Sequence, residues 1–312
     1  MDDGTEMDKR VDRMVRELRK EHHKCTRTYR NIVFAGGGLK GLMYLGGWQA
    51  IVNSGGIGRI KRMVGTSAGA IVIMLLVAGF HPMELVMFMK NLDFPNLLKI
   101  DLSQFWESYS VNSGDRLWYV LKRLIESKQH ITAETTMLEY FHKTGIRLVF
   151  VATDMCGCEP AYLSYETFPD LSILTAARMS SAIPGFFAPV EYNDRLYVDG
   201  GCVDNFPIQQ IPEDEHDSTI CFCPDSGLCY PNRIGSIEDY LERMYRAISS
   251  ASVKTKLIRY RNIIVPFDHS IHRLSTLSLS KTISELLDVY DETYNQTIKF
   301  LRQRDANTGS NN

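Results

Sequence analysis

The sequence Gly65-Thr66-Ser67-Ala68-Gly69 follows a short apolar run, Ile60 to Val64, and leads into a second one. A G-x-S-x-G motif between a strand and a helix is typical of hydrolases in which the serine stands on a sharp, strained turn. Gly65 and Gly69 flank the serine because neighbouring strands and helices leave no room for a Cβ atom there. The motif predicts a strand, a tight turn that carries Ser67, and a helix.

A glycine-rich sequence, Ala35-Gly36-Gly37-Gly38-Leu39-Lys40-Gly41, lies upstream of the serine motif and follows the apolar run Asn31 to Ala35. The backbone N–H groups of such a turn can bind an anion or a developing oxyanion. Two strand–turn–helix units in succession favour a parallel sheet with helices on its faces. The two motifs in this order indicate acyl transfer to a serine nucleophile.

The glycine run also matches the dinucleotide-binding fingerprint, which requires an acidic residue about 20 positions further on. No Asp or Glu occurs between Gly41 and Glu84, and there is no P-loop motif. The cysteines lack paired C-x-x-C spacing, and no acidic residues have EF-hand spacing. We therefore expect no cofactor and no metal, and an activity that persists in chelator.

The bulk composition fits one large intracellular domain. The chain has 312 residues, 44% of them hydrophobic. Its 35 basic and 37 acidic residues nearly cancel, which gives no reason to expect nucleic acid as a partner. Seven cysteines, an odd number, favour a reducing compartment, and Met1 to Lys24 carries charges where a secretory signal would be apolar. The expected location is cytoplasmic, with peripheral contact to membranes.

The chain divides into four predicted segments. Residues 1–30 form an N-terminal amphipathic helical segment, residues 31–211 the catalytic core, residues 212–304 a strand and helices packed on the same domain, and residues 305–312 a polar tail. Val64 to Met83 lacks charged residues, but the serine turn inside it favours a buried helix over a membrane span. Further predicted elements are a strand over Arg147–Thr153, a helix over Leu171–Met179, a hairpin of Val190–Tyr192 with Leu196–Val198, a strand over Thr219–Cys223, and helices over Ile237–Arg261 and Ile283–Leu301.

The apolar region Met83 to Gly114 has two interpretations. Its large side chains form part of a helical layer, or some of them form a lipid-facing rim beside the serine. The residues concerned are Phe88, Met89, Phe94, Leu97, Leu98, Phe105 and Trp106.

A serine nucleophile needs a base, and no histidine after Ser67 has a recognisable catalytic setting. Tyr197-Val198-Asp199-Gly200-Gly201 instead places a carboxylate at the end of a strand, beside two glycines. A carboxylate whose charged form is poorly solvated has a raised pKa and can accept the serine proton. Asp199 is therefore the candidate base.

These motifs together resemble the patatin-like phospholipase family. The resemblance rests on the glycine loop Gly36–Gly41, on Gly65–Gly69 with Ser67, and on Asp199-Gly200-Gly201, and it covers Asn31 to Ile211. Val151–Asp154, Ser181–Phe187 and Asp204–Pro207 add to it.

The resemblance implies a three-layer α/β/α fold with a mainly parallel central sheet. It implies a Ser67 nucleophile, an Asp199 base and an oxyanion hole made by the amides of Gly36, Gly37 and Gly38. Lys40 stands where many members have arginine, and it either contacts a phosphate singly or braces the loop. The other supporting positions are Gly41, Gly65, Gly69, Gly200 and Gly201.

The implied function is a lipid acyl hydrolase of the phospholipase A type, a serine esterase whose substrate is a phospholipid or another acyl lipid. Two alternatives remain at this point. The same dyad serves a triacylglycerol or lysophospholipid hydrolase, or the fold serves as a catalytically silent lipid- or protein-binding module.

Overall fold

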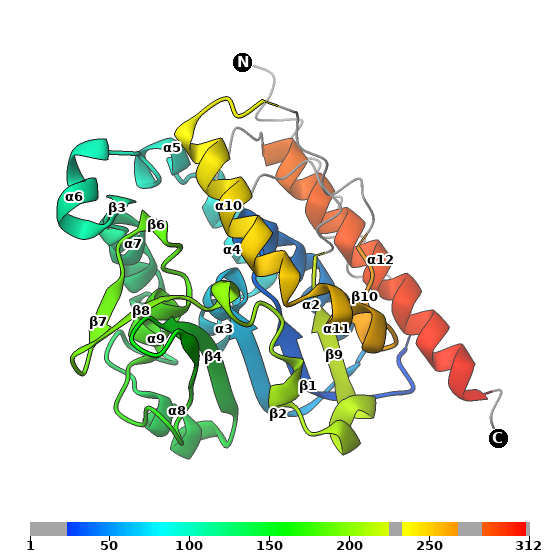
Figure 1. Ribbon diagram of the computed structural model, residues 1–312. Coiled ribbons are helices and arrows are strands. Elements are labelled where there is room, and N and C mark those ends of the chain that lie inside the picture. Colours follow the sequence, from blue (N-terminus) through cyan, green and yellow to red (C-terminus); the bar gives the residue numbers. More distant parts are fainter. Residues whose placement is uncertain (1–23, 225–232, 268–282, 310–312) are drawn as a thin grey trace.

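The computed structural model describes residues 24–224, 233–267 and 283–309 (Figure 1). Within these residues, eight strands form one sheet in the order β10-β9-β1-β2-β4-β8-β7, with β5 paired to β4. The pairs from β10 to β4 are parallel, whereas β4 pairs antiparallel with β5 and β8, and β7 with β8. The strands are β1 Tyr29–Phe34, β2 Ile57–Thr66, β4 Arg147–Asp154, β5 Glu159–Leu163, β7 Val190–Tyr192, β8 Arg195–Asp199, β9 Thr219–Phe222 and β10 Ile264–Val265, while β3 Ser110–Asn112 and β6 Gly185–Phe187 form a separate pair.

The hairpin predicted over Val190–Tyr192 and Leu196–Val198 is present in the structure. The hairpin of β7 and β8 turns at Asn193 and Asp194, whose φ angles of 50° and 58° match a turn that favours these two residue types. The helices are α2 Leu42–Asn53, α3 Ala68–Val77, α4 Pro82–Lys90, α5 Phe94–Leu97, α6 Phe105–Ser108, α7 Asp115–Glu126, α8 Met137–Thr144, α9 Ile173–Ser180, α10 Ile237–Ala251, α11 Lys254–Arg259 and α12 Ile283–Gly309.

Alternate residues of the central strands face two different layers, as the pleat of a strand requires. In β1, Ile32 and Phe34 pack in a large cluster with residues of α2, α3, α8, α9 and α12. Val33 and Ala35 pack on the opposite face with apolar residues that follow β8 and with Val253, just before α11. The sheet is therefore the middle of three layers, and the predicted α/β/α fold with a mainly parallel sheet is confirmed.

Two predicted elements differ from the structure. The helix expected over Ile237–Arg261 is broken between α10 and α11, where buried Val253 packs against the sheet. The polar tail expected from residue 305 is instead the last part of α12, and the Asp305 carboxylate accepts hydrogen bonds from the Thr26 amide at 3.1 Å and its hydroxyl at 2.7 Å. Residues 1–23 of the N-terminal segment predicted as helical, residues 1–30, lie outside the described residues, and its described part is not helical: residues 24–28 lie in no helix and β1 begins at Tyr29.

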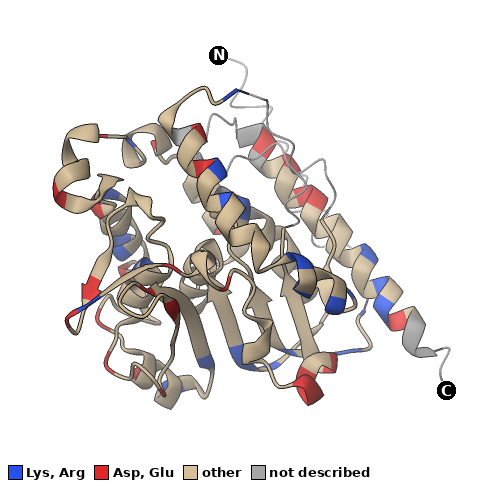
Figure 2. Cartoon of the chain, in the orientation of Figure 1, with Lys and Arg blue, Asp and Glu red and all other residues tan. Residues whose placement is uncertain are grey.

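The charged residues along α12 are ordered as the dipole of this helix favours (Figure 2). Figure 2 shows acidic residues in the first half of α12 and basic residues towards its end, the arrangement that its dipole favours. Arg243, Lys256 and Arg259, which are among the basic residues of α10 and α11, pair with Asp239, Asp204 and Glu213, respectively.

In the described part of the chain, no single helix has both the length and the apolar composition of a membrane span. α3 and α4 without its last residue meet that test only when taken together, and they are bent by 119° at the break between them. Most of α3 is buried in the domain, as expected for Val64 to Met83.

Candidate active site

Strand register brings the two predicted reactive side chains together. Thr66, the last residue of β2, pairs with Val151 of β4, and the next residue of β4, Ala152, pairs with Asp199 at the end of β8. Ser67 and Asp199 therefore lie on either side of the same strand end. The Ser67 hydroxyl donates a hydrogen bond of 2.6 Å to Oδ2 of Asp199.

Ser67 occupies the strained turn that its motif predicts. Its φ is 54° and its ψ is −121°, a conformation that residues with a side chain rarely adopt. A Cβ atom at Gly69 would lie 2.3 Å from the Phe34 carbonyl oxygen, and one at Gly65 would lie 2.8 Å from the Ala70 nitrogen. Both glycines are needed because the backbone packs closely around this turn.

The Asp199 carboxylate is fully buried and well supplied with hydrogen-bond donors. Oδ1 accepts from the Gly201 amide at 2.7 Å and from the Tyr245 hydroxyl at 2.9 Å, while Oδ2 accepts from Ser67. Burial raises the pKa of Asp199 from 3.8 to about 6, and the three hydrogen bonds oppose that rise. The carboxylate is thus a stronger base than an exposed aspartate, yet it is ionised at neutral pH.

The glycine loop lies next to the serine at the end of β1, but one of its predicted donors is already engaged. The Gly36 amide donates to the Asn205 carbonyl oxygen at 3.0 Å, and the Asn205 side-chain amide donates back to the Gly36 oxygen at 3.3 Å. An amide held in this way cannot also serve an oxyanion, so the prediction for Gly36 as a donor is wrong. Gly37 and Gly38 remain the candidate donors.

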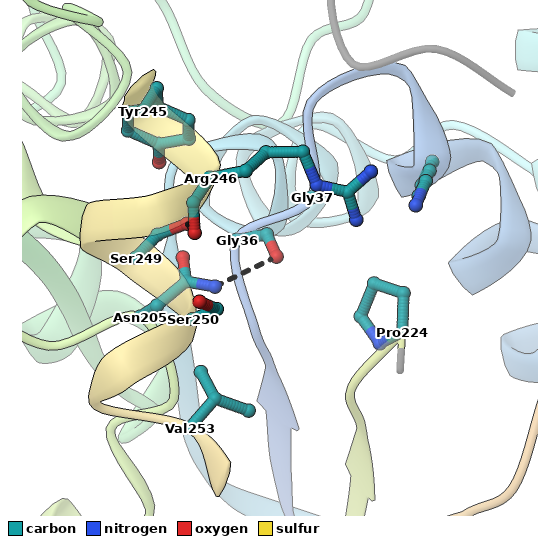
Figure 3. Close-up of a pocket in the computed structure, with 10 residues that line it drawn as sticks. Gly36, Gly37, Asn205, Pro224, Tyr245, Arg246, Ser249, Ser250 and Val253 are labelled. Carbon is teal, nitrogen blue, oxygen red and sulfur yellow. Dashed lines mark hydrogen bonds between the residues drawn. The ribbon is translucent and has the colours of Figure 1, made fainter. Parts of the chain in front are cut away.

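A small polar pocket of about 40 Å³ lies between the glycine loop and α10 (Figure 3). Its lining includes Gly36, Gly37, Lys40 and, from α10, Arg246. Lys40 is only 2% exposed, and this burial favours the bracing role among the two predicted for it. Pro224, Asn205, Tyr245, Ser249, Ser250 and Val253 complete the lining.

A larger apolar cavity of about 180 Å³ begins at Ser67 and follows one face of α3. Ala68, Ile71, Val72 and Leu75 line it at helical spacing, which gives a length of roughly 12 Å from the serine. Side chains of α4, α5 and α7 close its other sides, among them Leu85, Phe88, Met89, Phe94, Leu117, Leu121 and Leu124. Leu98, which follows α5, also lines it.

Several supporting contacts come from residues to which the sequence analysis assigned no role of their own, although Thr153 and Ser181 lie in stretches that carry the family resemblance. The Ser67 amide donates to the Ser180 hydroxyl at 2.9 Å, and the Ser181 hydroxyl donates to the Ser67 carbonyl oxygen at 3.3 Å. The Thr153 hydroxyl donates to the Asp199 carbonyl oxygen at 2.8 Å. The serines at the end of α9 give some sequence signal for the first two contacts. The hydrogen bond from Tyr245 to Asp199 has no such signal, because Tyr245 lies within an ordinary amphipathic helix.

The other supporting glycines act through close packing. A Cβ atom at Gly200 would lie 2.1 Å from the Val151 carbonyl oxygen, and one at Gly201 would lie 2.1 Å from the Tyr245 hydroxyl. Gly41 packs against the Cβ atom of Ala68, at the beginning of α3. These contacts set the distance between the glycine loop, the serine turn and the Asp199 strand. Among the residues that the structure describes, no group of three or more His, Cys, Asp or Glu side chains could hold a metal ion.

The sequence pattern of the patatin-like phospholipases matches residues 32–211. This match covers more than half of the chain and includes the glycine loop, Ser67 and Asp199. The chain belongs to the patatin-like phospholipase family.

Curated relatives are similar to this chain in sequence, and a solved structure is similar to it in fold. A probable lipid hydrolase, 463L, of Invertebrate iridescent virus 6 is 33% identical over 185 residues, or 58% of this chain and 62% of the viral protein. The uncharacterised protein R571 of Acanthamoeba polyphaga mimivirus is 29% identical, over 61% of this chain and 64% of its own length. The chain thus spans less than two thirds of either relative. VipD from Legionella pneumophila has a similar fold, with a TM-score of 0.57 at 17% identity over 91% of this chain and 71% of VipD.

Proposed function

We propose that this protein is a lipid acyl hydrolase of the phospholipase A type that works through a Ser67–Asp199 dyad. The observation that carries the proposal is the 2.6 Å hydrogen bond to the buried Asp199 carboxylate from the hydroxyl of Ser67, a residue that lines the apolar cavity. A silent binding module has no need for a strained serine paired with a basic carboxylate.

The reaction follows from the placement of these groups. Asp199 takes the Ser67 proton as Oγ attacks the ester carbonyl, and the Gly37 and Gly38 amides stabilise the oxyanion. The carbon–oxygen bond to the alcohol breaks, and that alcohol receives the proton from Asp199. Water, deprotonated by the same carboxylate, then attacks the acyl-enzyme. The bond between the acyl carbon and Ser67 Oγ breaks, a fatty acid is released, and the proton passes from Asp199 back to Oγ.

The two pockets favour a phospholipid over a triacylglycerol. The apolar cavity suits one acyl chain, and Arg246, which lines the polar pocket beside the glycine loop, supplies a cation for the phosphate of the leaving group. Cationic side chains bind a phosphodiester by charge-assisted hydrogen bonds, which a triacylglycerol cannot accept.

Product analysis tests this proposal. Purified protein is incubated separately with vesicles of phosphatidylcholine, with lysophosphatidylcholine and with emulsified triolein, and free fatty acid is measured by mass spectrometry. We expect release to be fastest from the diacyl phospholipid. Faster release from triolein would assign the protein to the triacylglycerol hydrolases, and no release from any of them would contradict the enzymatic function.

The cavity along α3 predicts a limit on acyl-chain length. Leu75→Trp places a large ring about 12 Å from Ser67, so we expect hydrolysis of long-chain esters to fall about 10-fold or more. Hydrolysis of p-nitrophenyl butyrate should change little, because its short chain does not reach position 75. Ile258→Trp, at a site 76% exposed on α11, is the matched control. Equal losses on long and short esters would contradict this placement of the acyl chain.

We also propose that the protein contacts membranes peripherally through the segment Leu102–Tyr109. Trp106 is 85% exposed and Tyr109 is 69% exposed, and both residue types favour the interface between water and lipid. The segment continues from α5 and Leu98, which contribute to the apolar cavity. Hydrogen bonds that Asn112 donates to the carbonyls of Leu97 and Lys99 hold its base in place.

Replacing Trp106 by alanine should weaken co-sedimentation with phosphatidylcholine vesicles several-fold, because the indole no longer enters the lipid interface. Hydrolysis of the soluble p-nitrophenyl butyrate should be unaffected. Tyr119→Ala, at an exposed position on α7, controls for the general loss of a surface aromatic. Unchanged vesicle binding by Trp106→Ala would contradict the proposal that this segment contacts the membrane.

An intracellular, cytoplasmic location is proposed on the basis of cysteine chemistry. Cys156 and Cys158 are exposed free thiols, which persist more readily in a reducing compartment.

A further inference from the structure

Tyr245 reaches the candidate dyad from outside the region that defines the family. It lies on α10, beyond residues 32–211, and its side chain is 5% exposed. Its hydroxyl donates to Oδ1 of Asp199 at 2.9 Å, while the Ser67 hydroxyl donates to Oδ2. The two oxygens of the carboxylate are therefore held from opposite sides, one by the tyrosine and one by the serine.

The surrounding structure makes room for this tyrosine and fixes its position. A Cβ atom at residue 201 would lie 2.1 Å from the Tyr245 hydroxyl oxygen, so the second glycine of Asp199-Gly200-Gly201 admits that hydroxyl. Tyr245 and Leu241 pack in one apolar cluster with Ile183, Phe186 and Phe187, on the segment just before β7. Figure 3 shows Tyr245 on the same helix as Arg246 and Ser249, beside the glycine loop.

We propose that Tyr245 is a positioning residue of the dyad: it orients the Asp199 carboxylate towards Ser67 and stabilises its charged form. This inference rests on the proposed Ser67–Asp199 function. A hydrogen bond to the ionised carboxylate favours that form over the protonated one. With Oδ1 occupied by Tyr245 and by the Gly201 amide, Oδ2 is left to face the serine.

The protonation states of the neighbouring groups suit this role. Burial, and then the nearby charge of Asp199, raise the pKa of Tyr245 well above its usual value, so the phenol remains a donor throughout the working pH range. Burial raises the pKa of the Cys202 thiol, which also lies near Asp199, to about 12. Among the described residues that influence Asp199, the two titratable side chains, Tyr245 and Cys202, therefore stay neutral between pH 4 and 9. An acid limb of the pH–rate profile in this range thus reports the ionisation of Asp199 itself.

The test is the pH dependence of Tyr245→Phe, a variant that keeps the buried ring and removes only the hydroxyl. Two rates are measured from pH 4.5 to 9: kcat/KM for phosphatidylcholine hydrolysis, and covalent labelling of Ser67 by a fluorophosphonate. We expect the acid limb of both profiles to move up by about one pH unit, because the carboxylate loses a donor to its charged form. Rates at pH 5.5 should fall about 10-fold, and rates at pH 9 should fall less.

Tyr240→Phe is the matched control, since it removes a hydroxyl from an exposed tyrosine on the same helix. Gly201→Ala, which displaces the Tyr245 hydroxyl, should move the limb in the same direction. An unmoved acid limb in Tyr245→Phe, whether or not the overall rate falls, would overturn the positioning role. Labelling separates this outcome from failure of the proposed function. If the wild type hydrolyses no lipid, the acid limb can still be measured from the rate at which the fluorophosphonate labels Ser67.

Discussion

Ser67→Ala should abolish fatty-acid release, with a loss on the order of 10³-fold or more, because Oγ is the atom that forms the acyl-enzyme. The fold should survive. Alanine retains the Cβ atom that already occupies the turn, and the Ser67 backbone contacts with Ser180 and Ser181 do not depend on the hydroxyl.

The measurement is fatty-acid release from phosphatidylcholine vesicles by the wild type, by Ser67→Ala and by Ser127→Ala, a serine exposed at the end of α7. Circular dichroism confirms that each variant is folded. Substantial release by a folded Ser67→Ala protein would eliminate this serine as the nucleophile.

Asp199→Asn should cause a loss of similar size while leaving the site geometry almost unchanged. The asparagine oxygen can accept from Gly201 and Tyr245, as Oδ1 now does, but its amide nitrogen cannot take a proton from Ser67. Wild-type kcat/KM should rise with pH through an acid limb near pH 6, where Asp199 ionises. The residual activity of the variant should lack this limb, and a limb that persists in Asp199→Asn would assign the base to another group.

The same substitution should stabilise the fold at neutral pH. The folded state holds the Asp199 proton more tightly than the unfolded chain, because burial raises the pKa from 3.8 to about 6. This side chain therefore favours folding below about pH 4, and that contribution is lost as the pH rises through about 6. At pH 8 the asparagine variant should be more stable by up to about 3 kcal/mol.

Urea unfolding at pH 4 and pH 8 measures this difference. The advantage of Asp199→Asn should be present at pH 8 and nearly absent at pH 4. Equal wild-type and variant stabilities at both pH values would contradict the buried, destabilising carboxylate.

The parts of the site that sequence could predict have local signals. The strained turn at Ser67 needs glycines within two residues on either side. Asp199 is followed by two glycines, of which Gly200 leaves room for the β4 backbone and Gly201 for the Tyr245 hydroxyl. The first two parallel strands, β1 and β2, follow from apolar runs that each precede a glycine-containing turn. Fold class and the reactive pair are therefore readable from short motifs.

The remaining features depend on contacts between distant segments. The Gly36 amide is engaged by a carbonyl at residue 205, which no glycine pattern reveals. Tyr245 lies 46 residues beyond Asp199 in the chain, in a helix whose apolar stripe gives no sign that one hydroxyl faces a carboxylate. The break between α10 and α11 likewise depends on where Val253 meets the sheet. Tertiary packing determines these three features, and the periodicity of the sequence contains no information on that packing.

The central claim is that Asp199 activates Ser67 as a nucleophile, and covalent labelling tests it most directly. Wild type and Asp199→Asn are treated with a fluorophosphonate at pH 8, digested, and analysed by peptide mass spectrometry. We predict one adduct per wild-type chain, on Ser67, formed at least 100-fold more slowly in Asp199→Asn. An adduct on another residue, or equal labelling rates at Ser67 in the two proteins, would contradict the dyad.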